Sequence, residues 1–183
     1  MTTGTSPQTW ARIAGVLYLI TYLTGIVALT GGRGRLVAEL LSTACYVGVT
    51  IAFFFLFRRV SRPLSGIAAV VSLVGCIVGA LNALGLTSSS VNGLAFFGVY
   101  CLLIGTLIIR STLLPRFLGA LMVFGGVGWL TFLSPSLARA LAPYNFAPGL
   151  LGEGVLTLWL LVRGVNLGPH PERSGVSSAP RVA

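Results

Sequence analysis

The segment Pro148-Gly-Leu-Leu-Gly-Glu153-Gly-Val-Leu-Thr157-Leu-Trp-Leu-Leu-Val-Arg163-Gly164 decides how the rest of the chain is interpreted. It is an apolar run long enough to cross a membrane, and it contains the only acidic residue set deep in apolar sequence, Glu153. A carboxylate in the hydrocarbon costs about 3 kcal/mol or more unless it is protonated, paired or facing water. The segment therefore predicts a membrane helix whose carboxyl group needs partners from the other apolar segments.

The composition of the whole chain is typical of a membrane protein. Of its 183 residues, 55% are apolar and 8% are charged, and the mean hydropathy is +0.95. Ordinary soluble domains have about 25% charged residues. Because a helix needs about 20 apolar residues to cross the hydrocarbon, the chain has room for six spans and short loops. The sequence predicts an all-α fold, a polytopic membrane helix bundle with six transmembrane helices.

Charged residues and helix breakers divide the chain into a transmembrane domain and two polar ends. Residues 1–10 are predicted to be a polar leader, and residues 166–183, rich in Pro, Ser and Gly, a disordered tail. The transmembrane domain is predicted to span residues 11–165. Its helices are expected at about 11–30, 36–57, 63–86, 91–109, 117–133 and 148–164. Within the connecting segment 134–147, residues 136–142 are expected to lie as a short amphipathic turn among the lipid headgroups.

The arginines predict the orientation of these spans. Six spans place both termini on one side, which receives nine arginines, whereas the other side receives Arg33, Arg35 and Arg139. The nine are Arg12, Arg58, Arg59, Arg62, Arg110, Arg116, Arg163, Arg173 and Arg181. Because cytoplasmic loops have the excess of arginine, both termini are predicted to be cytoplasmic and the protein to lie in the cell membrane.

Several partner and cofactor classes are not expected. The arginines fall between apolar segments rather than in a basic stripe interleaved with aromatic residues, which argues against a nucleic-acid partner. Cys45, Cys76 and Cys101 lie within apolar segments and are interpreted as small buried side chains. The single histidine, His170, is in the polar tail, so neither a metal nor another cofactor is expected in the membrane.

A polar site is predicted around Glu153. Glycines flank it and Thr157 follows one turn later, so its carboxyl group is predicted to face the neighbouring helices. At 1.5 Å per residue, polar residues of other helices fall in the same outer half of the membrane, with Glu39 closer to the surface. These are Thr24, Ser42, Thr43, Asn82 and Thr131. Together they predict a polar cavity open to the outside.

Helical spacing predicts which faces turn inward. Tyr18 and Tyr22 lie on one face of the first helix, and Tyr46 continues a polar face of the second helix that begins at Glu39. Glu39 also follows Arg35 by four residues, which favours a solvated carboxylate at the membrane surface. For Glu153 and Asn82, a purely structural hydrogen bond between helices is the alternative to a functional role.

Two glycines in the third predicted helix, Gly75 and Gly79, have the spacing that lets two helix backbones approach closely. The contact is predicted either within the chain or between copies in a homo-oligomer or membrane complex.

Several stretches carry a resemblance to a known family. They include LPRFLG at 114–119 and GE at 152–153, and the others are 11–20, 55–64, 98–105 and 158–165. The chain resembles a bacterial integral-membrane family known as domain of unknown function 4386. The resemblance implies six spans and an embedded glutamate at position 153, and it implies no reaction.

Three functions remain open from the sequence. The favoured one is a non-catalytic scaffold, accessory subunit or hydrophobic-ligand binder with a polar site around Glu153. The alternative is a small-molecule or proton-coupled transporter in which Glu153 exchanges protons with each side. The third is an intramembrane enzyme that uses Glu153 as a general acid or base, although no Asp or intramembrane His is present to assist it.

Overall fold

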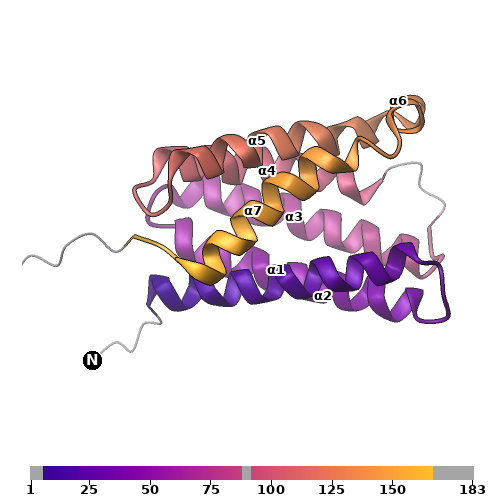
Figure 1. The fold of residues 1–183 in the computed structure, drawn as a ribbon, viewed down its shortest axis with the longest axis horizontal. Coiled ribbons are helices and arrows are strands. Elements are labelled where there is room, and N and C mark those ends of the chain that lie inside the picture. Colours follow the sequence, from indigo (N-terminus) through magenta and orange to yellow (C-terminus); the bar gives the residue numbers. More distant parts are fainter. Residues whose placement is uncertain (1–5, 88–91, 167–183) are drawn as a thin grey trace, which may run out of the picture.

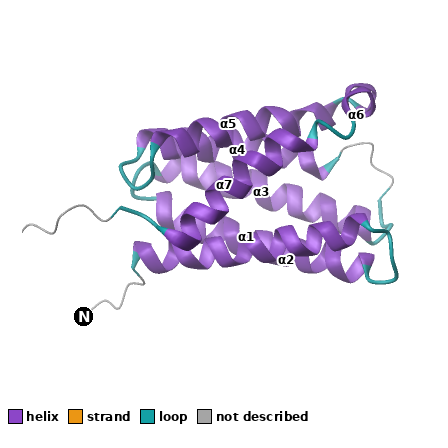
Figure 2. Ribbon diagram, in the orientation of Figure 1, coloured by secondary structure: helices purple, strands orange, loops and turns teal. Residues whose placement is uncertain are grey.

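The computed structural model describes residues 6–87 and 92–166. Over these ranges the protein contains seven α-helices, one 3-10 helix and no strand, which confirms the all-α prediction (Figure 2). The helices are α1 (Pro7–Leu29), α2 (Arg35–Phe57), α3 (Arg62–Ala83), α4 (Gly93–Arg110), α5 (Arg116–Leu130), α6 (Pro135–Leu141) and α7 (Phe146–Val162). The 3-10 helix, Thr131–Leu133, continues α5. The leader's residues 1–5, the start of the fourth predicted helix and the tail's residues 167–183 lie outside the described ranges.

The six long helices form a closed ring. Each of α1 to α4 packs on the next helix in the chain, α5 packs on α7, and α7 closes the ring by packing on α1. Figure 1 shows α7 crossing the front of the bundle diagonally, with α3 at the back. The axis of the ring is filled by side chains that are at most 1% exposed, including Tyr18, Phe53, Ile104, Met122 and Leu156.

The two ends of the ring differ in charge. The start of α1, the α2–α3 and α4–α5 connections and the end of α7 lie at one end, here called the arginine-rich end (Figure 1). The α1–α2 connection and α6 lie at the opposite end, here called the α6 end. Of the arginines in the described ranges, only Arg33, Arg35 and Arg139 belong to the α6 end.

The outer surface of the ring is suited to lipid. Large apolar side chains point outward from several helices, and Leu23, Val70 and Leu158 are 57–62% exposed. Within the described residues, α1 to α4 and the α5 segment Arg116–Leu133 are each long and apolar enough to cross a membrane. The pair α6 and α7, bent by 80°, supplies a sixth span if the two count as one.

Local capping shifts some helix ends from their predicted positions. α1 begins at Pro7 because the side chain of Ser6 accepts a hydrogen bond from the backbone N–H of Thr9. The last four residues of the predicted leader are therefore helical. α3 ends at Ala83 rather than at residue 86, since Gly85 adopts a φ of +67° that terminates the helix.

The final predicted span differs at both ends. α7 starts at Phe146, two residues earlier than predicted, and ends at Val162. Gly164, with a φ of +69°, closes it by donating its N–H to the carbonyl of Trp159. The short turn predicted at 136–142 coincides with α6, which begins one residue earlier at Pro135 and is capped by Ser134.

Glycines allow the closest helix contacts. A Cβ added at Gly105 would lie 2.7 Å from the carbonyl oxygen of Gly119, and one added at Gly119 would lie 2.7 Å from that of Gly105. The backbones of α4 and α5 are therefore in direct contact. Gly75 faces α4 of the same chain, and a Cβ added to it would lie 2.8 Å from the Cβ of Phe96. A Cβ added at Gly79 would meet no atom of the described residues within 4 Å. Contact between copies through this pair stays a prediction.

Candidate functional site

α7 places Glu153 inside the ring, where it is 6% exposed. Its Oε1 accepts a hydrogen bond from Nε1 of Trp129 at 2.6 Å and one from Sγ of Cys101 at 3.5 Å. Trp129 belongs to α5 and Cys101 to α4, so three helices meet at the carboxyl group. Gly149, one turn before Glu153, makes this possible because a Cβ there would collide with the Trp129 indole.

Tyrosines from three helices surround the same region. Tyr18, Tyr46 and Tyr100 are buried, with ring centroids 5.6 Å apart for Tyr18 and Tyr46 and 5.9 Å apart for Tyr46 and Tyr100. Tyr18 and Tyr46 both lie close enough to Glu153 to interact with it electrostatically. Within the described residues, none of the three hydroxyl groups has a hydrogen-bond partner. Buried hydroxyls of this kind are uncommon and call for an explanation.

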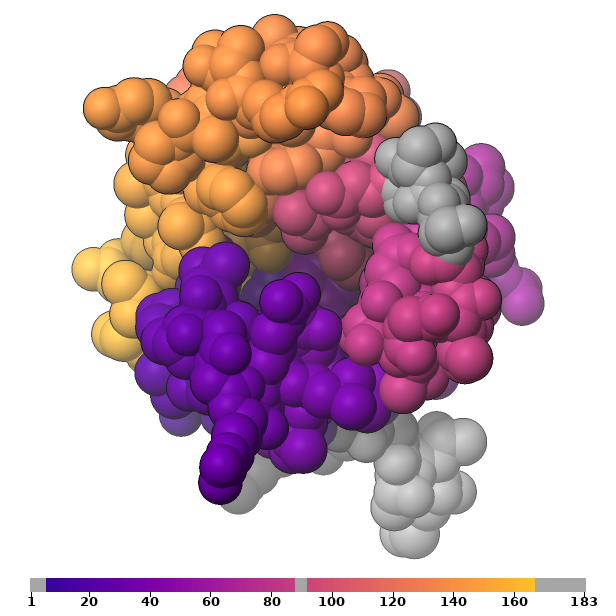
Figure 3. Space-filling model, turned by 90° about the vertical axis from the view of Figure 1, so that its right-hand side faces the viewer, coloured from indigo at the N-terminus to yellow at the C-terminus, as the bar shows by residue number. Residues whose placement is uncertain are grey.

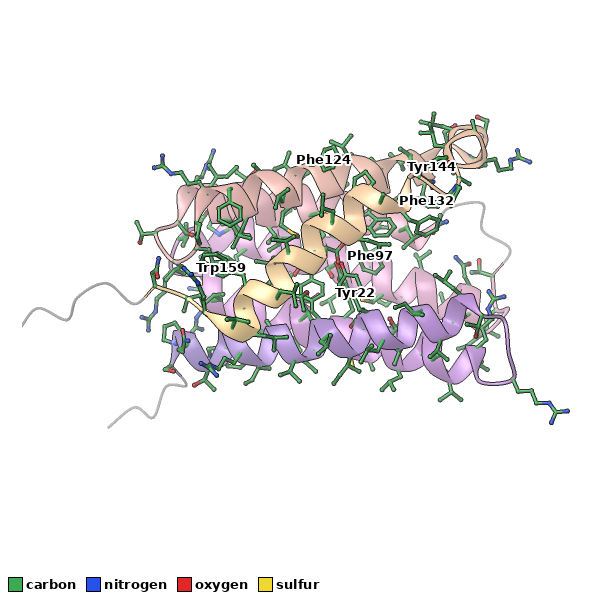
Figure 4. All side chains as sticks on the ribbon, in the orientation of Figure 1. Tyr22, Phe97, Phe124, Phe132, Tyr144 and Trp159 are labelled. Carbon is green, nitrogen blue, oxygen red and sulfur yellow. The ribbon has the colours of Figure 1, made fainter. Side chains whose placement is uncertain are left out.

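A further tyrosine ties α1 to α7. The hydroxyl of Tyr22 donates to the carbonyl of Leu150 at 3.1 Å, three residues before Glu153. Figure 4 shows Tyr22 and Phe97 beside α7 in the middle of the bundle. Phe97 also packs on Tyr46, with ring centroids 4.4 Å apart. Aromatic side chains of α1, α2 and α4 thus pack beside the part of α7 that holds Glu153.

No arginine of the described residues forms an ion pair with this carboxyl group. The one ion pair found in the described ranges joins Arg35 and Glu39 at 2.7 Å, near the start of α2. Glu153 instead accepts hydrogen bonds from two neutral groups, the indole N–H of Trp129 and the thiol of Cys101. A carboxyl group in such surroundings is suited to binding a hydrogen-bond donor or to exchanging a proton.

A hollow opens at the α6 end of the ring. Figure 3 views the molecule from this end and shows the hollow between α1 and α2 in indigo, the start of α4 in pink and the α6–α7 region in orange. In the opposite half of the ring the axis is closed by side chains with no exposure, including Phe53, Phe57, Leu107 and Leu160. The hollow therefore opens at the α6 end, and the axis is closed in the other half of the ring.

The structure does not gather the predicted polar residues around the carboxyl group. Thr157 is buried, but its hydroxyl donates to the backbone carbonyl of Glu153 at 2.8 Å. Thr24 and Thr131 likewise bond to carbonyls of their own helical turns, at 2.8 and 2.7 Å. These hydroxyl groups donate to backbone carbonyls of their own helices and not to the Glu153 carboxyl.

The other predicted members lie elsewhere. Ser42 donates to the carbonyl of Thr21 at 3.4 Å and so joins α2 to α1. Asn82 is exposed near the end of α3. Glu39 pairs with Arg35, as expected for a carboxylate at the membrane surface. Of the predicted set, only Glu153 itself presents its functional group to the interior.

Some of the side chains around Glu153 were predictable from the sequence. The inward orientation predicted for Tyr18 and Tyr46 is confirmed by their burial. Trp129 and Tyr100 were not predicted, and Cys101 was interpreted only as a small buried side chain. A signal for Trp129 did exist, because a tryptophan in an apolar span needs an acceptor for its N–H and Glu153 is the one deeply embedded carboxyl group.

The ring, its apolar exterior and its enclosed carboxyl group together define a multi-span integral membrane protein. Residues 88–164 match the model of the family described as domain of unknown function (DUF4386), which confirms the resemblance carried by the sequence. The matched region includes Tyr100, Cys101, Trp129 and Glu153, whereas Tyr18 and Tyr46 precede it.

An uncharacterized protein of Archaeoglobus fulgidus is 28% identical over 132 residues, which cover 66% of this chain and 78% of that protein. No solved structure shows a significant match to the chain. Within the described residues, no group of three or more His, Cys, Asp or Glu side chains is placed to hold a metal ion.

Proposed function

We propose that the protein is a non-catalytic membrane protein that binds a small molecule at Glu153, reached through the hollow at the α6 end. The observation that carries this proposal is the group of three buried tyrosine hydroxyls, Tyr18, Tyr46 and Tyr100, that lack partners around the carboxyl group. An unsatisfied buried polar group costs about 1–3 kcal/mol. A guest molecule that bonds to these hydroxyls and to Glu153 removes that cost.

The lining of the site defines the chemistry of the guest. The walls are aromatic, with Phe97 and the ring of Tyr46 in contact, while the hydrogen-bonding groups are few and close to Glu153. Sites with apolar walls and a few convergent polar groups bind small molecules that have an apolar body. The ligand is therefore a hydrophobic small molecule with one polar group that donates to the Glu153 carboxyl.

The distribution of arginine supports an orientation for this site. The excess of arginine at the arginine-rich end is typical of the cytoplasmic side. In this orientation both termini are cytoplasmic, the protein lies in the cell membrane, and the hollow opens to the outside.

One feature favours a carrier as the second candidate. The 80° bend between α6 and α7 precedes Glu153, and transporters place substrate sites at broken helices. A carrier must also open toward the arginine-rich end, where Phe57 and Leu107 close the axis in this conformation. An enzyme is less well supported, because the apolar segments contain no Asp or His that could assist Glu153 as an acid or base.

Access to the site is tested by cysteine labelling. In a background in which the three native cysteines are replaced by alanine, we expect Phe97→Cys to react with a membrane-impermeant thiosulfonate added to intact cells. Ile104→Cys is the matched control, because it lies two turns further along the same face of α4 and is 1% exposed in the closed half. Phe97→Cys should react at least about tenfold faster, since thiol reactivity follows access. Equal, negligible rates from both sides of the membrane would exclude a ligand route and overturn the proposal.

Ligand retention is tested directly on purified protein. After mild extraction, mass spectrometry of the intact protein should detect a bound small molecule that dissociates on activation. Glu153→Gln should reduce occupancy by at least about fivefold, because losing the partner of a buried hydrogen bond costs about 1–3 kcal/mol. Glu39→Gln, which removes the carboxylate at the membrane surface, should leave occupancy unchanged. Equal occupancy in both variants would place the molecule away from Glu153.

A further inference from the structure

We propose that the arginine-rich end holds a second binding site, specific for the phosphate group of an anionic ligand that has an apolar part. A cavity of about 370 Å³ lies there, between the start of α1, the end of α2 and the α4–α5 connection. This size falls within the range of about 300–1,000 Å³ that small-molecule sites occupy. Because this cavity and Glu153 lie in opposite halves of the ring, the inference does not depend on the function proposed above.

Two arginines supply the charge. Arg58 and Arg59 follow the last turn of α2, line the cavity and are exposed. Among the described residues neither takes part in an ion pair, and neither described glutamate lines the cavity. The planar guanidinium group donates two parallel hydrogen bonds to a phosphate, which makes adjacent arginines a suitable receptor for one.

An aromatic stack fixes the position of one of these arginines. The guanidinium carbon of Arg58 lies 4.7 Å from the centroid of the Phe55 ring. Phe55 stacks in turn on Trp10 of α1, with centroids 4.8 Å apart and planes 16° from parallel. The cation–π contact and the stack reduce the conformational freedom that Arg58 would lose on binding an anion.

Neutral polar groups complete the cavity. Thr112 lines it from the α4–α5 connection, and Asn166 lines it from the segment after α7. The backbone N–H of Asn166 donates to the carbonyl of Leu113 at 2.9 Å, which anchors this segment against the same connection. The first turn of α1 also borders the cavity, and the helix dipole favours an anion there.

The depth of the cavity in the membrane favours a phospholipid headgroup as the source of the phosphate. Trp10 is at the depth of the membrane–water boundary in the predicted topology, and basic pockets at that depth bind headgroups of anionic phospholipids. A soluble phosphate would meet the same two arginines from the water. The shared chemistry is recognition of a phosphate by Arg58 and Arg59, and the experiment separates the two sources.

The test uses the full chain in nanodiscs. One arm compares discs of phosphatidylcholine with discs that also contain phosphatidylglycerol, and the other adds inorganic phosphate to phosphatidylcholine discs at constant ionic strength. The readouts are the fluorescence of Trp10, taken as the difference between each variant and the same variant with Trp10→Phe, and the unfolding temperature. The double variant Arg58→Gln with Arg59→Gln should weaken the response at least about tenfold, as expected when two charge-assisted bonds are lost.

The matched control removes the same charge from the same end. Arg110 and Arg116 flank the α4–α5 connection but do not line the cavity, so the double glutamine variant at these positions should respond like the parent. A response to phosphatidylglycerol identifies a headgroup site, and a response to inorganic phosphate identifies a soluble one. The inference is overturned if the parent responds to neither, or if both double variants lose the response equally. If the glutamine variant does not fold, Arg58→Lys with Arg59→Lys keeps the charge and should still bind several-fold more weakly, because lysine lacks the planar fork.

Discussion

Alanine at Gly105 or Gly119 is expected to lower the free energy of unfolding by about 1–3 kcal/mol, the usual cost of overpacking, or more. Each added methyl group would lie 2.7 Å from the carbonyl oxygen of the other glycine. That atom belongs to a backbone, so it cannot rotate away as a flexible side chain would. The contact is relieved only if α4 and α5 separate along their length. The effect is measurable as a lower midpoint of unfolding by a denaturing detergent in mixed micelles.

The control for this prediction is Gly79→Ala. A Cβ at Gly79 meets no atom of the described part of the chain within 4 Å, so its effect should stay within about 0.5 kcal/mol, as for most substitutions away from packed sites. If Gly105→Ala unfolded at the same midpoint as Gly79→Ala, the direct contact between the backbones of α4 and α5 would be wrong.

The fold was largely predictable because hydrocarbon thickness sets the length of a span. Apolar runs between arginines gave the number and order of the long helices. Their ends were less predictable, since they depend on local conformations such as the positive φ at Gly85 and the Ser6 cap. The closed ring was not predicted, because glycine spacing shows that a face packs closely but does not show against which helix.

The site was only partly predictable for a different reason. Depth in the membrane placed Thr24 and Thr157 near the level of Glu153, but threonine in a helix bonds to the carbonyl four residues earlier and needs no outside partner. An indole N–H cannot reach its own backbone in this way and takes an acceptor from another helix. Trp129 and the tyrosines therefore determine the surroundings of Glu153, while the hydroxyls predicted from depth do not.

Removing the indole donor is expected to destabilise the protein by about 1–3 kcal/mol, the cost of leaving a buried polar group unpaired. In Trp129→Phe the Glu153 carboxyl loses its 2.6 Å bond and keeps only the thiol of Cys101 at 3.5 Å. In Glu153→Met the indole N–H is the group left unpaired. The double variant leaves neither group unpaired, so its cost should be smaller than the sum of the two single costs.

The coupling energy of Trp129 and Glu153 is the difference between the sum of the two single costs and the cost of the double variant. Its size shows whether the indole is the group that holds the carboxyl. Hydrogen bonds between membrane helices average about 0.6 kcal/mol and reach about 1.7 kcal/mol, and a short bond to a carboxyl group in a buried site should lie near the upper value. Trp159→Phe combined with Glu153→Met is the control cycle and should show no coupling, because Trp159 packs on Phe117 and under Arg163 instead. Equal coupling in both cycles would mean that Glu153→Met disturbs α7 as a whole.

Coupling below about 0.5 kcal/mol for Trp129, within the error of additivity, would mean that other donors hold the carboxyl group. The tyrosine hydroxyls would then be those donors, and a ligand at Glu153 would have no unsatisfied group left to bind.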